Sequence, residues 1–299
     1  MIKGIGLTKT FENKVALDTL NFEIEDGCIY GLIGSNGSGK STLLRLISGV
    51  YAPDAGALLI DGEPVFNNPA KKAQVAFLGD TPYYLPQANI KEMADFYRQM
   101  YESFDNKVYA RLLEIFPLNE KMRIATMSKG MQRQAALILA IATCPKILLL
   151  DEAFDGLDVV MRQVLKNILI EGMEDRQMTT IIASHNIREL EDLCDHISLI
   201  HDGQLKFNDS ADRLKGKLHK VQIAFSEMPP EEAFSPLQVL KSERTGMLLQ
   251  MVVRGYKDEI LEHCHRLSPL FVECIEPSLE EMFIYELEVA GYDAKSLAE

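Results

Sequence analysis

The sequence contains no tryptophan, only five cysteines, and no apolar run long enough to cross a membrane. The cysteines are scattered, form no C-x-x-C pair and are odd in number, so we expect neither a disulfide framework nor a zinc site. The N-terminus has no apolar segment of the secretory-signal kind. These absences favour a cytoplasmic protein whose thiols are reduced.

Basic residues are also in deficit. The 299 residues include 31 Lys and Arg against 44 Asp and Glu, which gives a formal charge of −13. Because neutralisation of phosphates needs clustered basic side chains, we do not expect a nucleic-acid partner. An apolar share of 47% is ordinary for a soluble globular protein, and the length allows one large domain or two smaller ones.

The charge is unevenly distributed along the chain. Residues 221–299 carry six basic and 15 acidic side chains, a net −9 of the total −13. This shift predicts one domain over residues 1–219 and a second over residues 220–299. No internal repeat or low-complexity segment is visible.

The first domain is predicted to be α/β, with a mainly parallel sheet covered by helices. Residues 89–116 have helical spacing up to Pro117, and a second helix follows Ser128 to about Thr143, which predicts a helical subdomain over about 80–145. The apolar run 146–151 is typical of a strand buried on both faces. Other strands are expected at 2–8, 20–24, 28–33, 57–60, 179–183 and 197–201, and other helices within 39–49 and at 159–171 and 186–194.

The second domain is predicted to be a small α+β unit. Its strands are expected at 220–225, 236–242, 246–254 and 270–275, and its helices at 256–267 and 278–289.

One glycine-rich segment, which reads GSNGSGKST, fits the phosphate-loop pattern G-x-x-x-x-G-K-[ST]. It lies between an apolar strand and an apolar helix, a context that disfavours a chance turn. Glycines let backbone N–H groups converge on phosphate oxygens, and the helix N-terminus adds positive charge. We expect Lys40 to reach the β- and γ-phosphates and Ser41 to hold Mg²⁺. The predicted phosphate-binding residues are Gly34, Ser35, Asn36, Gly37, Ser38, Gly39, Lys40, Ser41 and Thr42.

Two adjacent carboxylates, Asp151 and Glu152, end the buried strand at 146–151. Ligands of open α/β sheets bind at the carboxyl ends of the strands. Asp151 is therefore a candidate Mg²⁺ ligand, and Glu152 a candidate general base for an attacking water. Taken alone, the pair could equally be a solvated strand end.

The segment MSKGMQRQ, residues 127–134, lies between these two motifs. With them it resembles the ATP-binding subunits of ABC transporters, whose signature usually reads Leu-Ser-Gly-Gly-Gln. Ser128 and Gly130 match that signature, whereas Met127, Lys129 and Met131 depart from it. In isolation the segment would be only an N-capped helix.

Other positions match the family one by one. Asp158 corresponds to the aspartate of its D-loop, and His185 to its switch histidine at the end of the next strand. Phe11 stands where the family places an aromatic ring that stacks on adenine, although an ordinary core or surface Phe is a fair alternative. Asp80 departs from the pattern, because it stands where the family has a glutamine. A carboxylate there can also bind Mg²⁺.

The resemblance implies a P-loop NTPase fold of the ABC ATPase type, with ATP and Mg²⁺ as cofactors. It also implies catalysis by Glu152, His185 and Lys40, with metal ligation by Ser41, Asp151 and Asp80. The partners implied are a second copy or a paralogous ATPase subunit, joined head to tail over ATP, and a separate integral membrane permease. The subunit would then sit at the cytoplasmic face of the membrane and power export.

Three other functions are weighed against this one. A soluble ABC ATPase acting on ribosomes usually carries two cassettes, but only one phosphate loop is present. A chromosome ATPase of the SMC type needs a long coiled coil between its motifs, and no sustained heptads occur there. A non-enzymatic nucleotide switch needs a disabled site, which Asp80 and the altered signature leave open.

Overall fold

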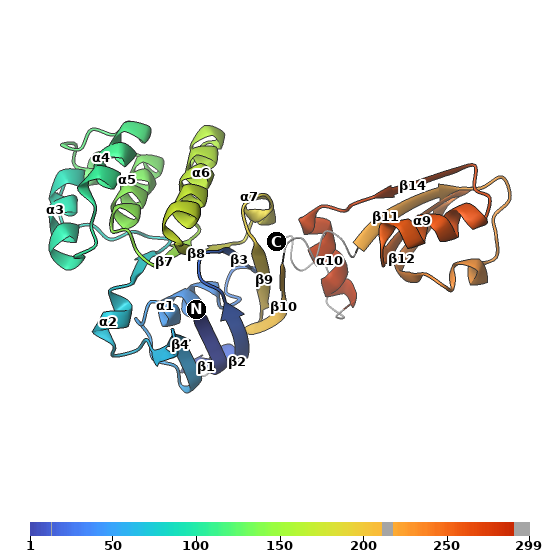
Figure 1. The fold of residues 1–299 in the computed structure, drawn as a ribbon, viewed down its shortest axis with the longest axis horizontal. Helices are drawn as coiled ribbons and strands as arrows, with labels where there is room; N and C mark the ends of the chain where they lie inside the picture. Colours follow the sequence, from blue (N-terminus) through green and yellow to red (C-terminus); the bar gives the residue numbers. More distant parts are fainter. Residues whose placement is uncertain (13, 211–217, 290–299) are drawn as a thin grey trace. The chain divides into compact units, whose positions relative to one another are not determined.

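The computed structural model describes residues 1–12, 14–210 and 218–289. Its contacts divide the chain into two units, Met1–Asn208 and Asp209–Glu299, whereas the charge shift placed a boundary after residue 219 (Figure 1). In the described part of the chain, no helix has both the length and the apolar character that crossing a bilayer requires.

The first unit begins with an antiparallel sheet in the order β2-β1-β4-β5. The β1–β2 hairpin is longer than the sequence predicted, because the backbone pairing continues to Phe11 and Lys14. Irregularities in register interrupt the pairing of these two strands. The bounds are β1 Ile2–Phe11, β2 Lys14–Ile24, β4 Ala55–Ile60 and β5 Glu63–Pro64.

A six-stranded sheet forms the centre of this unit, in the order β10-β9-β3-β8-β7-β6. The pairings β6–β7, β7–β8, β8–β3 and β3–β9 are all parallel, as predicted. β3, β7 and β8 are buried along their whole length, which explains the apolar runs of β3 and β7, whereas β8 also buries Thr179, Thr180 and Ser184. The bounds are β3 Ile29–Ile33, β6 Val75–Leu78, β7 Ile147–Asp151, β8 Thr179–Ser184, β9 His196–His201 and β10 Gln204–Ser210.

The predicted helical segment 89–116 is two helices, not one. Helix α3 ends at Met100, since Tyr101 is extended, and Asp105 caps a new helix by accepting hydrogen bonds from the Lys107 and Val108 amides. Helix α5 packs against both α3 and α4 (Figure 1). The helical bounds are α1 Lys40–Ile47, α2 Pro69–Lys72, α3 Ile90–Met100, α4 Asn106–Ile115, η1 Ile124–Thr126, α5 Lys129–Ala142, α6 Val159–Arg176 and α7 Ile187–Leu190.

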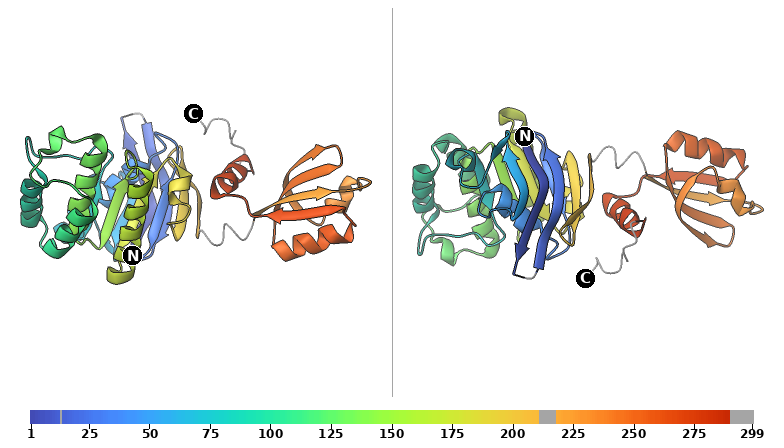
Figure 2. Two further views of the ribbon diagram at one scale, coloured as in Figure 1. Left: turned by 90° about the horizontal axis from the view of Figure 1, so that it is seen from above. Right: turned by 90° about the horizontal axis from the view of Figure 1, so that it is seen from below.

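One apolar core joins the two sheets of the first unit. It takes Leu17 from the hairpin, Leu44 from α1, and Leu149 and Ile181 from the central strands. Figure 2 shows the antiparallel strands lying alongside the parallel sheet. This core holds α1, and with it the loop that precedes α1, against the sheet.

The second unit is an antiparallel sheet in the order β12-β13-β11-β14, with α9 packed on one face (Figure 2). Its core includes Val221, Met251, Val253 and Cys264. All six elements predicted for the tail are present, although the strand predicted at 236–242 is observed as β12, which begins at Gln238 and ends at Thr245. The bounds are β11 Leu218–Ala224, η2 Glu231–Phe234, β12 Gln238–Thr245, β13 Leu248–Arg254, α9 Lys257–Arg266, β14 Phe271–Ile275 and α10 Leu279–Val289.

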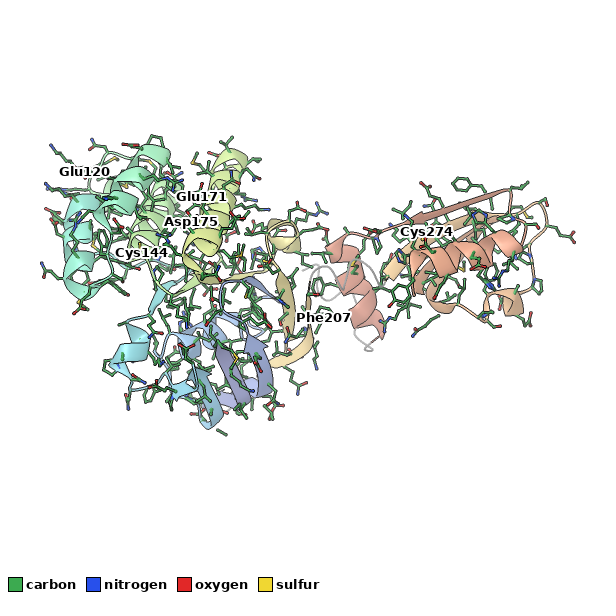
Figure 3. The ribbon with its side chains drawn as sticks, viewed as in Figure 1. Glu120, Cys144, Glu171, Asp175, Phe207 and Cys274 are labelled. Atoms are coloured by element: carbon green, nitrogen blue, oxygen red, sulfur yellow. The ribbon has the colours of Figure 1, made fainter. Side chains whose placement is uncertain are left out.

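All five cysteines are free, as the sequence indicated. Figure 3 labels Cys144, just after α5, and Cys274 on β14, which belong to different units. Burial raises the pKa of the Cys28 thiol to about 12, so this thiol stays protonated and behaves as a small apolar side chain.

Leu149→Ala in β7 is expected to lower the free energy of unfolding by about 3 kcal/mol, because Leu149 is fully buried and its truncation leaves a cavity. Leu85→Ala removes the same atoms from a side chain that is 36% exposed, and should cost less. Urea unfolding followed by circular dichroism measures both. Equal losses would contradict the packing described for β7.

Candidate functional site

The phosphate loop follows β3 at the carboxyl edge of the parallel sheet. Gly39 ends the loop at φ 115°, and a Cβ there would lie 2.7 Å from the Ala16 carbonyl oxygen. A Cβ on Gly34 would overlap the carbonyl of Ile200. Glycine is therefore required at both ends of the loop by close backbone approach, and at Gly39 also by its backbone conformation.

Lys40, the first residue of α1, has its ammonium group folded back over the loop. Nζ donates hydrogen bonds to the carbonyl oxygens of Gly34 at 2.6 Å and Ser35 at 3.1 Å, and lies 3.8 Å from Glu152 Oε1. The residue is only 5% exposed. Burial lowers the pKa of Lys40, and the carboxylates of Glu152 and Asp151 oppose that shift.

Asp151 lies at the end of β7, next to Ser41. It is 1% exposed, and its Oδ1 has no hydrogen-bond partner within the residues that the structure describes. Burial raises the pKa of Asp151, against which a hydrogen bond with Ser41 acts. A buried carboxylate oxygen without a partner, beside a hydroxyl group, is suited to take up a hard cation.

Glu152 is joined directly to His185 across the ends of β7 and β8. His185 Nδ1 lies 2.9 Å from Glu152 Oε2, and the Glu152 amide donates to the Ala183 carbonyl at 2.9 Å. Glu152 has a backbone φ of 50°, a strained value for a non-glycine residue. Its carboxylate contacts both Lys40 and His185.

The turn that carries His185 is held by a buried polar network. Ser184 Oγ donates to Glu189 Oε2 at 3.0 Å and accepts from the Asn186 amide at 3.0 Å, while Arg162 pairs with Glu189 at 3.1 Å. Burial raises the pKa of Glu189. These contacts fix the backbone on either side of His185, and the sequence motifs did not single out their residues.

Asp80 enters the site from the segment after β6, where it is held by Arg133 of α5. Arg133 donates to the carbonyl oxygens of Gly79 at 2.9 Å and Asp80 at 2.7 Å, and its Nη2 lies 3.3 Å from Asp80 Oδ1. Arg133 could not be identified from the sequence, because nothing in its local pattern shows that it reaches a residue so distant along the chain.

The phosphate loop, Asp80, Asp151 and Glu152 border a cleft of about 340 Å³, here named the phosphate-loop cleft. Its walls include Lys14 and Ala16, which the sequence analysis also missed, since only the fold of the β1–β2 hairpin brings them to the loop. The residues that line it are Lys14, Ala16, Asn36, Gly37, Gly39, Lys40, Ser41, Thr42, Asp80, Asp151 and Glu152.

Eight predicted site residues do not line this cleft: Gly34, Ser35 and Ser38 belong to the loop, His185 contacts Glu152, and the other four lie elsewhere. Ser128 caps α5 by accepting a hydrogen bond from the Met131 amide, and Asp158 caps α6 in the same way through the Met161 amide. Gly130 packs against Gly156, where a Cβ would come within 2.6 Å of the carbonyl oxygen. Phe11 packs edge-on against Tyr51 with ring centroids 5.3 Å apart.

Comparison with known proteins assigns the family. The ABC transporter family model matches residues 17–155. The ABC transporter ATP-binding protein NatA of Bacillus subtilis is 30% identical over 226 residues, which cover 72% of this chain and 91% of that protein. The chain belongs to the ATP-binding subunits of ABC transporters. It therefore binds ATP or ADP, and its reaction is ATP hydrolysis coupled to transport.

Relatives of this ATP-binding subunit differ in how much of the chain they match. The ABC transporter ATP-binding protein YtrB of B. subtilis is 28% identical over 285 residues, which cover 95% of this chain and 97% of that protein. The bacitracin transport ATP-binding protein BcrA of Bacillus licheniformis is 29% identical over 225 residues, 74% of this chain and 73% of its own. YtrB is thus similar across the second unit as well.

Solved structures confirm the fold of the ATP-binding subunit. An ATP-binding subunit of an ABC transporter aligns with a TM-score of 0.66 at 25% identity, over 72% of this chain and 92% of that one. A dimeric ATP-binding cassette bound to ADP and Pi aligns with a TM-score of 0.65 at 22% identity, over 71% of this chain and 99% of that one. The ABC ATPase fold predicted from the sequence is therefore confirmed.

Gly39→Ala is expected to weaken ATP binding by about tenfold or more, because a methyl group there strains the loop and strikes the Ala16 carbonyl. Gly62→Ala is the matched control. Gly62 also has a positive φ, of 79°, but a Cβ there meets nothing within 4 Å. Its substitution should cost about 1 kcal/mol of stability and leave ATP binding intact. Calorimetric titration with ATP separates the two; similar affinities in both variants would refute this account of the loop.

Proposed function

We propose that this subunit hydrolyses ATP at the phosphate-loop cleft with Mg²⁺, and that it powers export by a separate permease. The observation that carries the proposal is the contact of Glu152 with both Lys40 and His185. It joins the ends of β7 and β8 to the phosphate loop. A half-buried carboxylate, a buried ammonium group and an imidazole so arranged suit phosphoryl transfer to water.

Magnesium fits the residues at the end of β7. The unpartnered Oδ1 of Asp151 and the adjacent Ser41 hydroxyl offer two oxygen ligands, and Asp80 lines the same cleft. Among the described residues, no group of three or more His, Cys, Asp or Glu side chains could hold a metal by itself. That is as expected for Mg²⁺, which keeps water and phosphate oxygens as ligands. When bound, it would neutralise charge on the phosphates.

In this mechanism Glu152 accepts the proton of the attacking water, and His185 holds the carboxylate and contacts the γ-phosphate. Lys40 stabilises the charge on the transferred phosphoryl group, while the amides of the phosphate loop bind the β-phosphate. The segment from Gly34 to Thr42 thus binds the nucleotide, and Phe11 stacks on its adenine.

The site is completed by a second subunit. Ser128 and Gly130 lie outside the cleft of their own chain, on the exposed first turn of α5. We infer that they close over nucleotide held by the phosphate loop of another copy, or of a paralogous subunit, with Asp158 at the same interface. Two such sites in a head-to-tail dimer would bind two ATP. ATP would then stabilise the closed dimer, and hydrolysis would release it.

The membrane partner would contact the segment after Asp80. Tyr83 is 77% exposed, whereas the neighbouring Tyr84 is anchored through its hydroxyl group to the Gln132 carbonyl at 2.6 Å. An exposed aromatic on an anchored loop suits a protein interface. The subunit would lie at the cytoplasmic face of the membrane through this permease. The proposed cargo is a small molecule, drug or peptide, which the name of BcrA, a bacitracin transport protein, supports.

Glu152→Gln is expected to reduce ATP turnover by about 100-fold or more, because an amide cannot accept the proton of water. ATP binding should persist, and ATP should trap a dimer that the native chain reopens. Glu114→Gln, an exposed glutamate on α4, is the matched control and should behave as native. Turnover and light scattering with Mg-ATP measure these effects; native turnover in the Glu152 variant would exclude this residue as the base.

Tyr83→Ser is expected to release the subunit from membranes that contain its permease, while turnover of the isolated chain stays native. Tyr256→Ser, at a comparably exposed tyrosine of the second unit, is the matched control. Sedimentation of membranes after co-expression measures the bound share. Full retention of the Tyr83 variant would place the permease contact elsewhere.

A further inference from the structure

The contact between Asp80 and Arg133 differs from an ordinary surface ion pair. The Arg133 guanidinium is buried, and two of its bonds go to the backbone carbonyls of Gly79 and Asp80. The backbone of Asp80 is therefore fixed, and its carboxylate is directed by the same group. Oδ2 of Asp80 has no hydrogen bond or ion pair within the part of the chain that the structure describes.

Asp80 brings an additional negative charge to a cleft that already holds Asp151 and Glu152. Because Asp80, Asp151 and Glu152 line the same cleft, their charges act on the same bound groups. An amide at position 80 would add no charge. Phosphates that enter the cleft without a cation meet this added repulsion, whereas a divalent cation turns it into attraction.

We propose that Arg133 is a positioning residue that holds the Asp80 carboxylate at the phosphate-loop cleft and thereby makes nucleotide binding strongly dependent on a divalent cation. The inference rests on the proposed function of this cleft. The guanidinium offsets part of the charge of Asp80 while leaving Oδ2 able to act on the cation, directly or through water. Asp80 would then act on the metal, whereas Arg133 would act on it only by holding Asp80.

The test compares ATP dissociation constants in EDTA and in Mg²⁺ for the full-length chain. In Asp80→Asn, which keeps the shape but not the charge, the ratio of the two constants should fall by about tenfold, mainly because ATP binds better without metal. Asp95→Asn is the matched control, since Asp95 pairs with Arg98 on α3 and does not line the cleft. Its ratio should equal that of the native chain.

Arg133→Gln should lower the same ratio, because it removes the group that holds the Asp80 carboxylate at the cleft. In the Asp80→Asn background the Arg133 substitution should leave the ratio unchanged, and this non-additivity distinguishes positioning from a general structural role. If Arg133→Gln does not fold, Asp80→Asn decides the question by itself. A ratio that Asp80→Asn leaves at the native value, or an Arg133 effect that is equal in both backgrounds, overturns the inference.

Lys40→Ala separates failure of this inference from failure of the proposed function. If the native chain and this variant bind Mg-ATP equally, the cleft is not the nucleotide site and the proposed function fails. If only the native chain binds Mg-ATP, the cleft is the nucleotide site. The ratios of dissociation constants measured for the Asp80 and Arg133 variants then test the further inference alone.

Discussion

The buried ammonium group of Lys40 sets the demands that the rest of the site meets. A charge in that position is stable only if polar groups surround it, and here these are the carbonyls of its own loop and the carboxylate of Glu152. Glu152 in turn reaches His185, whose turn is held by Ser184 and Glu189. The site is thus a chain of contacts that begins at one lysine.

The order of the strands makes this chain of contacts possible. β3 pairs with β8, and β8 pairs with β7, so the phosphate loop, the switch histidine and the acidic pair leave the sheet at neighbouring points. In the aligned registers Ile33 lies opposite Ser184 and Asp151 lies opposite Ala183. Lys40 and Glu152, more than 100 positions apart in the sequence, therefore meet at the edge of the sheet.

The sequence predicted the parts of the site that are encoded by local pattern. The pattern of a strand, a glycine-rich loop and a helix predicted the role of Lys40. An apolar run that ends in two acidic residues predicted Asp151 and Glu152. Arg133, Lys14 and Ala16 could not be found in this way, because tertiary packing alone brings them to the cleft. The break between α3 and α4 was missed because helical spacing continues across it, and only Asp105 signals a new cap.

In the proposed dimer, helix α5 contributes to two sites at once. Its first turn carries Ser128 and Gly130 away from the cleft of their own chain, whereas Arg133 of the next turn reaches back to Asp80. The two departures from the family pattern, Asp80 and the altered signature, are therefore linked by Arg133 of α5. An ATP-binding subunit built in this way is half of an active unit, and a second copy or a paralogous subunit supplies the other half.

The most direct test of that account mixes two inactive variants, Lys40→Ala and Ser128→Arg. In a head-to-tail dimer, one site of each mixed pair combines a native phosphate loop with a native signature. The account predicts that an equal mixture recovers about a quarter of native ATP turnover, since half of the dimers are mixed and each has one intact site. If the native chain turns over ATP while the mixture is no more active than either variant alone, the shared site is contradicted.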